Sequence, residues 1–375
     1  MFLIRLVFVL ILVLWPIVDV FCDTISVVGN RFKDSANNTI VLHGVVRAGS
    51  EYACVNGWGF FDSTITTLND DIEVPFFKSW RMNAVTIPLN EDCWLGINGV
   101  LPEYSGINYI NAIKHEVLML EANGIYPVLS LFFTDNGTTS PALSQKSMPD
   151  SAHTPIFWQS VAKVFKTDLN VIFKLKEESF PAGNADTLAA WKCWHFGDVQ
   201  FDASGSLTPV SSISNCSEGF STVGMQSLVN IIRGTGSTNV ISLTGIQYAN
   251  TLTHFLDFTY RIKDTLLNPQ LAVSADIYPD QNPCASITCY TAQYAPIIAV
   301  MPFFAGEIGE SIDGSDAATT AVDTLMTWLD GRGAGYSAWA WNTYGGSLQL
   351  ITAYGTGTAK SSFGTDFKAH ISTLH

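Results

Sequence analysis

Positive charge is scarce in this sequence, and that scarcity excludes one class of partner. The 375 residues include 19 lysines and arginines against 33 aspartates and glutamates, a formal net charge of −14. Charged residues make up only 14% of the chain, well under the usual quarter. Nucleic-acid binding needs clustered lysine and arginine to neutralise phosphates. We therefore expect no nucleic-acid partner and a neutral ligand instead.

Several catalytic and binding motifs are also missing. The sequence has no GxSxG, HExxH or CxxC motif, which disfavours a serine hydrolase, a zinc peptidase and a zinc site. The turn after the first predicted strand reads HGVVRAG over residues 43–49. That turn is not the GxGxxG turn that cradles a dinucleotide in an open, doubly wound sheet.

Long apolar runs are absent except near the start of the chain. Arg5 precedes an apolar run from Leu6 to Trp15, an arrangement typical of a signal peptide. We predict a signal peptide over residues 1–22 and a secreted mature chain over residues 23–375 that forms one domain. An uncleaved anchor is the alternative, but the run is slightly short for a span, so no stable membrane insertion is expected.

Cysteine, in contrast, is well represented beyond the predicted signal peptide. The six residues are Cys54, Cys93, Cys193, Cys216, Cys284 and Cys289. Six cysteines allow 15 connectivities, and the sequence alone does not decide between them. Closure between sequence neighbours favours the pairs 54–93, 193–216 and 284–289. Cysteines in this number agree with export to an oxidising compartment.

Short apolar strands alternate with helical stretches along the chain. The predicted strands are Val41–Val46, Asn83–Leu89, Tyr126–Phe133, Asn170–Lys176, Asn239–Gly245, Leu271–Tyr278, Val300–Ile308 and Tyr336–Trp341. Helices are expected between them, for example over Tyr109–Ala122 and Pro155–Phe165. Eight strand–helix units predict an α/β fold, a closed (β/α)₈ TIM barrel, with an open doubly wound sheet as the alternative. Residues 24–40 predict a small N-terminal hairpin at the bottom of the barrel.

Acidic and aromatic residues gather where the predicted strands end, which is where such barrels carry their active sites. Glu177 and Glu178 follow the fourth strand, Asp276 and Tyr278 end the sixth, and Glu307 ends the seventh. One carboxyl group can protonate a glycosidic oxygen while a second attacks the anomeric carbon or activates water. This combination therefore suggests glycoside hydrolysis.

Five segments carry a resemblance to a known family, two of them at residues 148–158 and 224–228. Residues 83–96 (NAVTIPLNEDCWLG), 304–310 (FAGEIGE) and 338–343 (AWAWNT) resemble glycoside hydrolase family 5, the cellulase family of retaining endo-β-glucanases. The likeness runs in order from about residue 26 to 370. It implies a (β/α)₈ barrel that hydrolyses β-linked polysaccharide or oligosaccharide, most simply β-1,4-glucan, by double displacement and without a cofactor or metal. We expect a monomer.

The same resemblance implies roles for individual residues. Glu178 takes the place of the acid/base and Glu307 that of the nucleophile, and their carboxyl groups should lie about 5–5.5 Å apart. Trp341, or less directly Trp339, takes the place of the sugar platform, and Tyr278 should approach the nucleophile. The further candidates for substrate binding are Glu177, Asp276, His43 and Trp94.

The active-site surroundings depart from the family pattern at several positions, including Val46, where the family has asparagine. The family has asparagine where this chain has Glu177, arginine where it has Thr86, and histidine where it has Phe132 and Asp276; Lys174 stands in place of an acidic residue. Loss of a cation and gain of carboxyl groups both raise the pKa of a nucleophilic carboxyl group. Three interpretations remain open: a working hydrolase, a non-catalytic protein that binds carbohydrate or a partner, and a cation site formed by the carboxyl groups.

Overall fold

The chain folds into a closed barrel of parallel strands. The computed structural model describes residues 23–62, 72–279, 283–310, 320–344, 346–360 and 362–374. Around the barrel the strands are β4 (His43–Val46), β5 (Ala84–Asn90), β6 (Tyr126–Phe133), β7 (Ile172–Lys174), β10 (Ile241–Thr244), β11 (Leu271–Ile277), β12 (Phe303–Ile308) and β13 (Gly335–Trp339). Each of these strands lies within or overlaps a predicted one, so the predicted (β/α)₈ barrel is confirmed.

The interior of the barrel changes from apolar to polar toward the carboxyl ends of its strands. Val128, Ile172, Val240 and Ala272 belong to one apolar cluster. Because successive side chains of a strand alternate between its two faces, the residue two positions later faces the same way. Those residues are Ser130, Lys174, Ser242 and Ser274, and all four are fully buried. The barrel therefore has an apolar base and a polar layer beneath its mouth.

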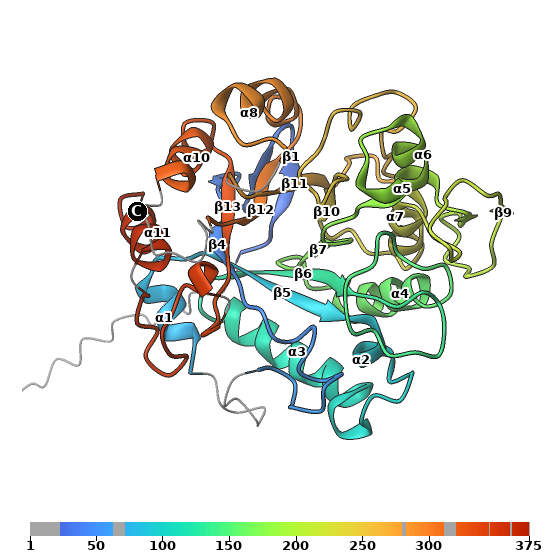
Figure 1. The fold of residues 1–375 in the computed structure, drawn as a ribbon, viewed down its shortest axis with the longest axis horizontal. Helices are drawn as coiled ribbons and strands as arrows, with labels where there is room; N and C mark the ends of the chain where they lie inside the picture. Colours follow the sequence, from blue (N-terminus) through green and yellow to red (C-terminus); the bar gives the residue numbers. More distant parts are fainter. Residues whose placement is uncertain are drawn as a thin grey trace, which may run out of the picture.

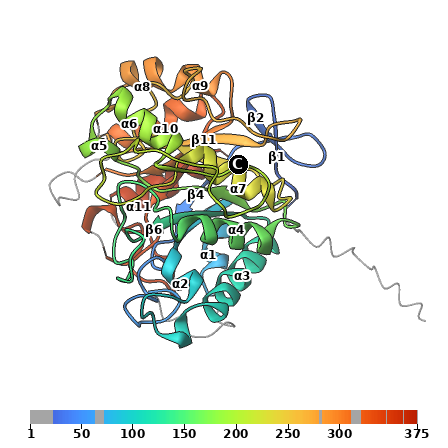
Figure 2. The ribbon, with the colours of Figure 1, turned by 90° about the vertical axis from the view of Figure 1, so that its right-hand side faces the viewer.

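Helices cover the outside of the barrel (Figures 1 and 2). They are α1 (Val74–Ser79), α2 (Glu91–Leu95), α3 (Ile107–Glu121), α4 (Thr154–Phe165), α5 (Pro181–Asn184), α6 (Leu188–Phe196), α7 (Met225–Gly234), α8 (Ile287–Gln293), α9 (Ala295–Ile298), α10 (Thr320–Asp330) and α11 (Phe363–Ile371), with 3₁₀ turns at Pro102–Tyr104 and Gly346–Leu348. The predicted helices around α3 and α4 are present. Amphipathic faces explain the packing, since the buried residues of α4 recur at helical spacing.

A small antiparallel sheet closes the amino-terminal end of the barrel. It contains β1 (Ser26–Val28), β2 (Arg31–Lys33) and β3 (Thr39–Ile40) in that order. Ile25 and Phe32 pack into the apolar base. The predicted hairpin is therefore present with one additional strand. In Figure 2 these strands lie at the opposite end of the molecule from α5 and α6.

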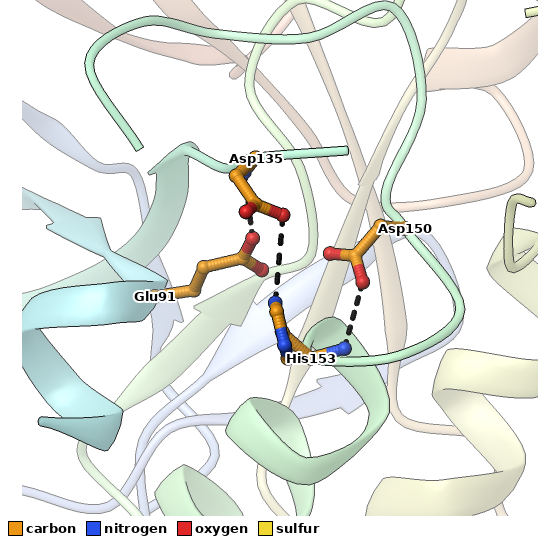
Figure 3. Close-up of side chains that lie close together, drawn as sticks. All are labelled: Glu91, Asp135, Asp150 and His153. Carbon is orange, nitrogen blue, oxygen red and sulfur yellow. Dashed lines mark hydrogen bonds and ion pairs between the residues drawn. The ribbon is translucent and has the colours of Figure 1, made fainter. Parts of the chain in front are cut away.

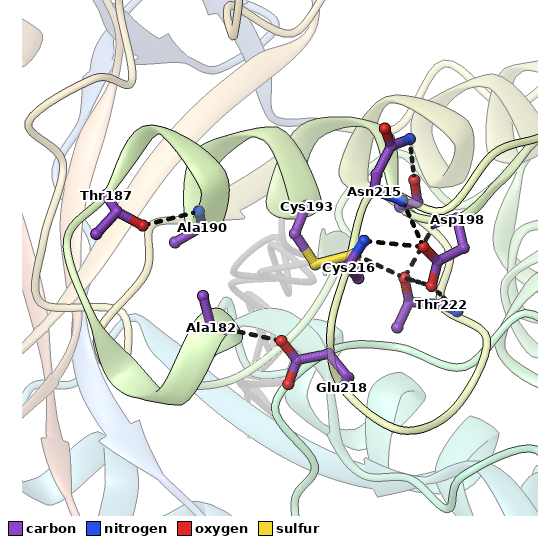
Figure 4. The surroundings of a disulfide bond; sticks show 10 residues. Ala182, Thr187, Ala190, Cys193, Asp198, Asn215, Cys216, Glu218 and Thr222 are labelled. Carbon is purple, nitrogen blue, oxygen red and sulfur yellow. Dashed lines mark hydrogen bonds between the residues drawn. A yellow bond between two sulfur atoms is a disulfide. The ribbon is translucent and has the colours of Figure 1, made fainter.

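Three disulfides join the pairs that closure between sequence neighbours favours: Cys54–Cys93, Cys193–Cys216 and Cys284–Cys289. The second bridge ties α6 to the loop that follows β8 (Val199–Gln200) and β9 (Ser211–Ser212), as Figure 4 shows. Near this bridge the Asp198 carboxylate accepts backbone hydrogen bonds from Asn215 (2.8 Å) and Cys216 (2.9 Å). These contacts fix a long insertion beside the barrel mouth.

The predicted signal peptide, residues 1–22, lies outside the described residues. None of the helices in the described ranges is long and apolar enough to cross a membrane.

Candidate active site

Glu307 lies near the end of β12 with its carboxyl group in the barrel mouth. A register shift between β11 and β12 brings Asp276 level with Glu307. The Tyr278 hydroxyl, just beyond β11, donates a hydrogen bond of 2.5 Å to Glu307 Oε2. Glu307 Oε1 has no hydrogen-bond partner among the described residues, although the side chain is only 2% exposed. A buried carboxylate oxygen in this state is available to a ligand.

Lys174 lies at the centre of the carboxyl groups. Its ammonium contacts Glu177 Oε2 and lies 3.2 Å from Asp276 Oδ1. The other Glu177 oxygen accepts a hydrogen bond of 2.5 Å from the Ser130 hydroxyl. Carboxylate oxygens of Glu177, Asp276 and Glu307 lie within 4.8 Å of one another. Three predicted site residues therefore meet, and the Lys174 ammonium supplies the positive charge that a cation would otherwise bring to them.

Burial dominates the electrostatics of this cluster. It raises the pKa of Glu307 well above its usual value, and Asp276, Glu177 and Glu178 raise it further, while Lys174 opposes them. The pKa of Asp276 is also raised, chiefly by burial. For Lys174, burial would lower the pKa, but Asp276, Glu177 and Glu307 together raise it above the usual value. The lysine therefore stays charged, whereas the carboxyl groups of the cluster are not all ionised at the same time.

Glu178 follows β7 in a strained conformation, with φ of 42°. The Tyr248 backbone N–H donates a 3.0 Å hydrogen bond to the next residue, Ser179, which helps to hold this turn. Burial is the main cause that raises the pKa of Glu178. Glu178 is also one of the groups that raise the pKa of Glu307.

Two aromatic rings meet near the carboxyl ends of β13 and β6. Trp339 ends β13 and is partly exposed, and its ring centroid lies 5.7 Å from that of Phe132 at the end of β6. Thr86 on β5 is fully buried, and its hydroxyl has no hydrogen-bond partner among the described residues. No cation projects from position 86, where the family resemblance implies an arginine.

Three residues predicted to bind the ligand are packed into the protein in this structure. Trp341 is fully buried, with ring centroids 5.0 Å from those of Phe77 and of Trp80, because the chain turns into the core after β13. Trp94 is 1% exposed and its indole N–H donates to Ser160, since α2 packs against α4. Neither ring offers a face to a sugar.

His43 is the third of these packed residues. It is the first residue of β4 and therefore lies at the amino-terminal end of the barrel, away from the mouth. Its Nε2 lies 3.4 Å from Asp330 Oδ1 at the end of α10, and its ring packs 4.8 Å from that of Tyr336. Its role is to join β4 to the outer helices.

A second group of acidic residues, which the sequence did not single out as a cluster, lies beyond β5 and β6 (Figure 3). It contains Glu91, Asp135, Asp150 and His153, with ligand atoms within 4.8 Å of one another. Glu91 accepts hydrogen bonds of 2.8 Å from the Asp135 backbone N–H and from the Thr154 hydroxyl. Because both Glu91 oxygens are occupied by protein donors, the group acts as a structural link between loops.

Comparison with known proteins places this geometry in context. Residues 64–345 match the cellulase family, glycosyl hydrolase family 5. No curated protein matches the sequence significantly.

Solved structures share the fold. The β-glucanase SdGluc5_26A from Saccharophagus degradans aligns over 94% of each chain with a TM-score of 0.65 and 17% identity. Its complex with cellotetraose aligns over the same shares with a TM-score of 0.66 and 16% identity. The catalytic domain of endoglucanase Cel5A from Thermobifida fusca aligns over 93% of this chain and 97% of its own, with a TM-score of 0.60 and 12% identity.

Proposed function

Because this chain belongs to the cellulase family, glycosyl hydrolase family 5, we propose that it is a retaining glycoside hydrolase of β-linked polysaccharide, with β-1,4-glucan as the first candidate. The observation that supports this most is the buried Glu307 carboxyl group near the end of β12, which accepts a hydrogen bond from the Tyr278 hydroxyl. Two carboxyl groups with separate environments can divide the roles of nucleophile and acid.

In the first step, a Glu307 oxygen forms a bond to the anomeric carbon as the bond to the leaving oxygen breaks. Glu178 gives its proton to that oxygen, which departs as a sugar hydroxyl. In the second step, Glu178 takes a proton from water, and the resulting oxygen displaces Glu307 from the anomeric carbon. Each step inverts the anomeric centre, so the product retains the original configuration.

The mechanism needs Glu178 protonated and Glu307 ionised in the resting enzyme. The raised pKa of Glu178 favours its role as an acid, and the raised pKa of Glu307 means that ionisation requires a higher pH. Because both pKa values are raised, the pH optimum moves upward, and we expect it to lie nearer neutrality than the usual pKa of a glutamate. This argues against an enzyme adapted to acid.

Membership of the cellulase family and the disulfides also support proposals about the substrate and the compartment. The Saccharophagus degradans β-glucanase was crystallised with cellotetraose, and we propose that cello-oligosaccharides occupy the mouth of this barrel too, with Trp339 as the stacking platform. Three disulfides support secretion into an oxidising environment. We retain the proposal of a monomer.

A second candidate is a protein that binds carbohydrate without cleaving it. The observation that favours it is the crowding of Glu307 by Asp276 and Glu177, which stabilises the protonated, non-nucleophilic form of Glu307.

The test is an assay of soluble β-glucan hydrolysis between pH 5 and pH 9, in which the released reducing ends are measured. We expect activity that Glu178→Gln lowers by more than about 100-fold, because general acid–base catalysis typically contributes 10²–10⁴-fold. Oligosaccharide binding by calorimetry without reducing ends at any pH would favour the second candidate.

A further inference from the structure

Lys174 is a fully buried lysine inside the barrel, and its surroundings are built to hold an ammonium. On β7 it pairs in register with Ser130 of β6 and Ser242 of β10. Its Nζ contacts one Glu177 oxygen and lies 3.2 Å from one Asp276 oxygen. Removing a charge from water is costly unless such partners compensate it, so two carboxylates are needed to keep this lysine in place.

The Lys174 side chain crosses the barrel interior to reach β12. A Cβ atom at Gly306 would collide with the Lys174 ammonium and would lie 2.8 Å from Asp276 Oδ1. Glycine at position 306 therefore makes room for the ion pair. Because Gly306 directly precedes Glu307, the ammonium lies immediately beside the backbone of the candidate nucleophile.

The charged and titratable groups around Glu307 come from two strands and the turns that follow them. Glu177, Glu178 and Lys174 come from β7 or the turn after it, and Asp276 and Tyr278 come from β11 or its end. Asp276, Glu177 and Glu178 all favour the neutral form of Glu307, and Lys174 opposes them.

The neighbouring lysine is arranged differently. Lys176 Nζ donates hydrogen bonds to the backbone oxygens of Phe132 (3.3 Å) and Glu177 (2.9 Å). It therefore ties the ends of β6 and β7 together, whereas Lys174 faces the carboxyl groups.

We propose that Lys174 is a positioning residue that keeps Glu307 in its charged, attacking form, by binding Glu177 and Asp276 and placing a fixed positive charge beside Glu307. This inference rests on the proposed hydrolase function. It assigns to β7 the cation that the family resemblance implies at position 86, where this chain has threonine. The family has arginine at position 86 and an acidic residue at position 174, whereas this chain has threonine and lysine. The positive charge near the nucleophile is therefore supplied from a different strand.

The test follows the titration of Glu307 by NMR in protein with ¹³C-labelled glutamate carboxyl groups, assigned with Glu307→Gln. Neutralisation by Lys174→Gln should move the Glu307 midpoint upward by at least about one pH unit, the usual effect of one close opposite charge. The conservative Lys174→Arg should restore most of the shift. A midpoint that Lys174→Gln leaves unchanged overturns the proposal.

Two further comparisons keep the test decisive. Arg233→Met breaks another buried ion pair, with Asp264, at the other end of the barrel, and should lower stability without moving the Glu307 midpoint. If Lys174→Gln fails to fold, the single variant Asp276→Asn is compared with the double variant Lys174→Met/Asp276→Asn. Neither variant leaves an unpaired carboxylate at position 276. The double variant should titrate at least about one pH unit above the single variant, and equal midpoints overturn the proposal.

These measurements also distinguish failure of the electrostatic role of Lys174 from failure of the proposed hydrolase function. In an active enzyme, the acidic limb of the kcat/KM profile should move upward with the Glu307 midpoint in Lys174→Gln. A shifted midpoint in a protein that neither hydrolyses glucan nor reacts with an activated fluorosugar would overturn the hydrolase function while supporting the electrostatic role of Lys174.

Discussion

Individual residues determine the charge of the barrel mouth, and most of them were visible in the sequence. Glu177, Asp276, Tyr278 and Glu307 were predicted from their places at strand ends, and the structure brings them together. The position of Lys174 was left open. Strand alternation could have predicted that Lys174 faces the barrel interior. Ile172 and Lys174 share a face of β7, and Ile172 belongs to the apolar base.

The hydrogen bond from Tyr278 to Glu307 gives a prediction at this scale. Tyr278→Phe removes the donor to a carboxylate, an interaction typically worth about 1.5–3 kcal/mol. Because a phenyl ring preserves the packing, we expect kcat/KM on an aryl cellobioside to fall by roughly 10-fold to 150-fold while the melting temperature changes little. A loss of stability that equals the loss of activity would contradict a role centred on Glu307.

Trp339 at the end of β13 and Trp341 just beyond it give a matched pair. Trp341→Ala should destabilise the protein by about 3–5 kcal/mol, because a large buried ring is lost from the core beside α1. Trp339→Ala should instead raise KM for cello-oligosaccharides with a smaller change in stability. Urea unfolding and steady-state kinetics on both variants check this, and the reversed pattern would restore Trp341 as the platform.

At the scale of elements, the sequence predicted the strands well because each is a short apolar run bounded by turns. Two of the three packed site candidates, Trp341 and Trp94, come shortly after a strand ends. Trp341 lies two residues after the last residue of β13, and Trp94 belongs to a short helix, α2, that begins directly after β5. Side-chain direction there depends on how the chain leaves the strand, which is decided by tertiary packing and not by periodicity.

The insertion after β7 supports a prediction about its disulfide. Replacing both Cys193 and Cys216 by serine opens a bridge that spans 23 positions. The chain-entropy account gives a loss of about 3 kcal/mol for a loop of this size. We expect that loss in chemical unfolding, while the pH profile of hydrolysis keeps its shape. A changed profile would mean that the bridge positions Glu178.

The whole molecule buries many carboxyl groups whose pKa values are raised. Burial raises the pKa of Glu51 to about 8, and it also raises those of Glu91 and Glu307. At Glu51 the folded state therefore binds more protons than the unfolded state between about pH 4.5 and pH 8, and Glu91 and Glu307 act in the same direction. Stability from these groups is complete below their unfolded pKa and is lost as the pH rises through the folded values.

We accordingly expect the melting temperature to be highest near pH 5 and to fall toward pH 8. Glu51→Gln should flatten part of this decline, because glutamine cannot ionise in the same site. Calorimetry of both proteins across this range checks the sign, and a melting temperature that rises from pH 5 to pH 8 would refute it.

The central claim, that Glu307 is a competent nucleophile, is tested most directly by trapping. The mature protein is incubated with an activated 2-deoxy-2-fluorocellobioside at pH 6 and pH 8, and its intact mass is measured. The account predicts a glycosyl adduct on Glu307 that forms faster at pH 8, because ionisation of a carboxyl group with a raised pKa is required, and no adduct on Glu307→Gln. Absence of an adduct at both pH values, in protein that still binds cellotetraose, would contradict it.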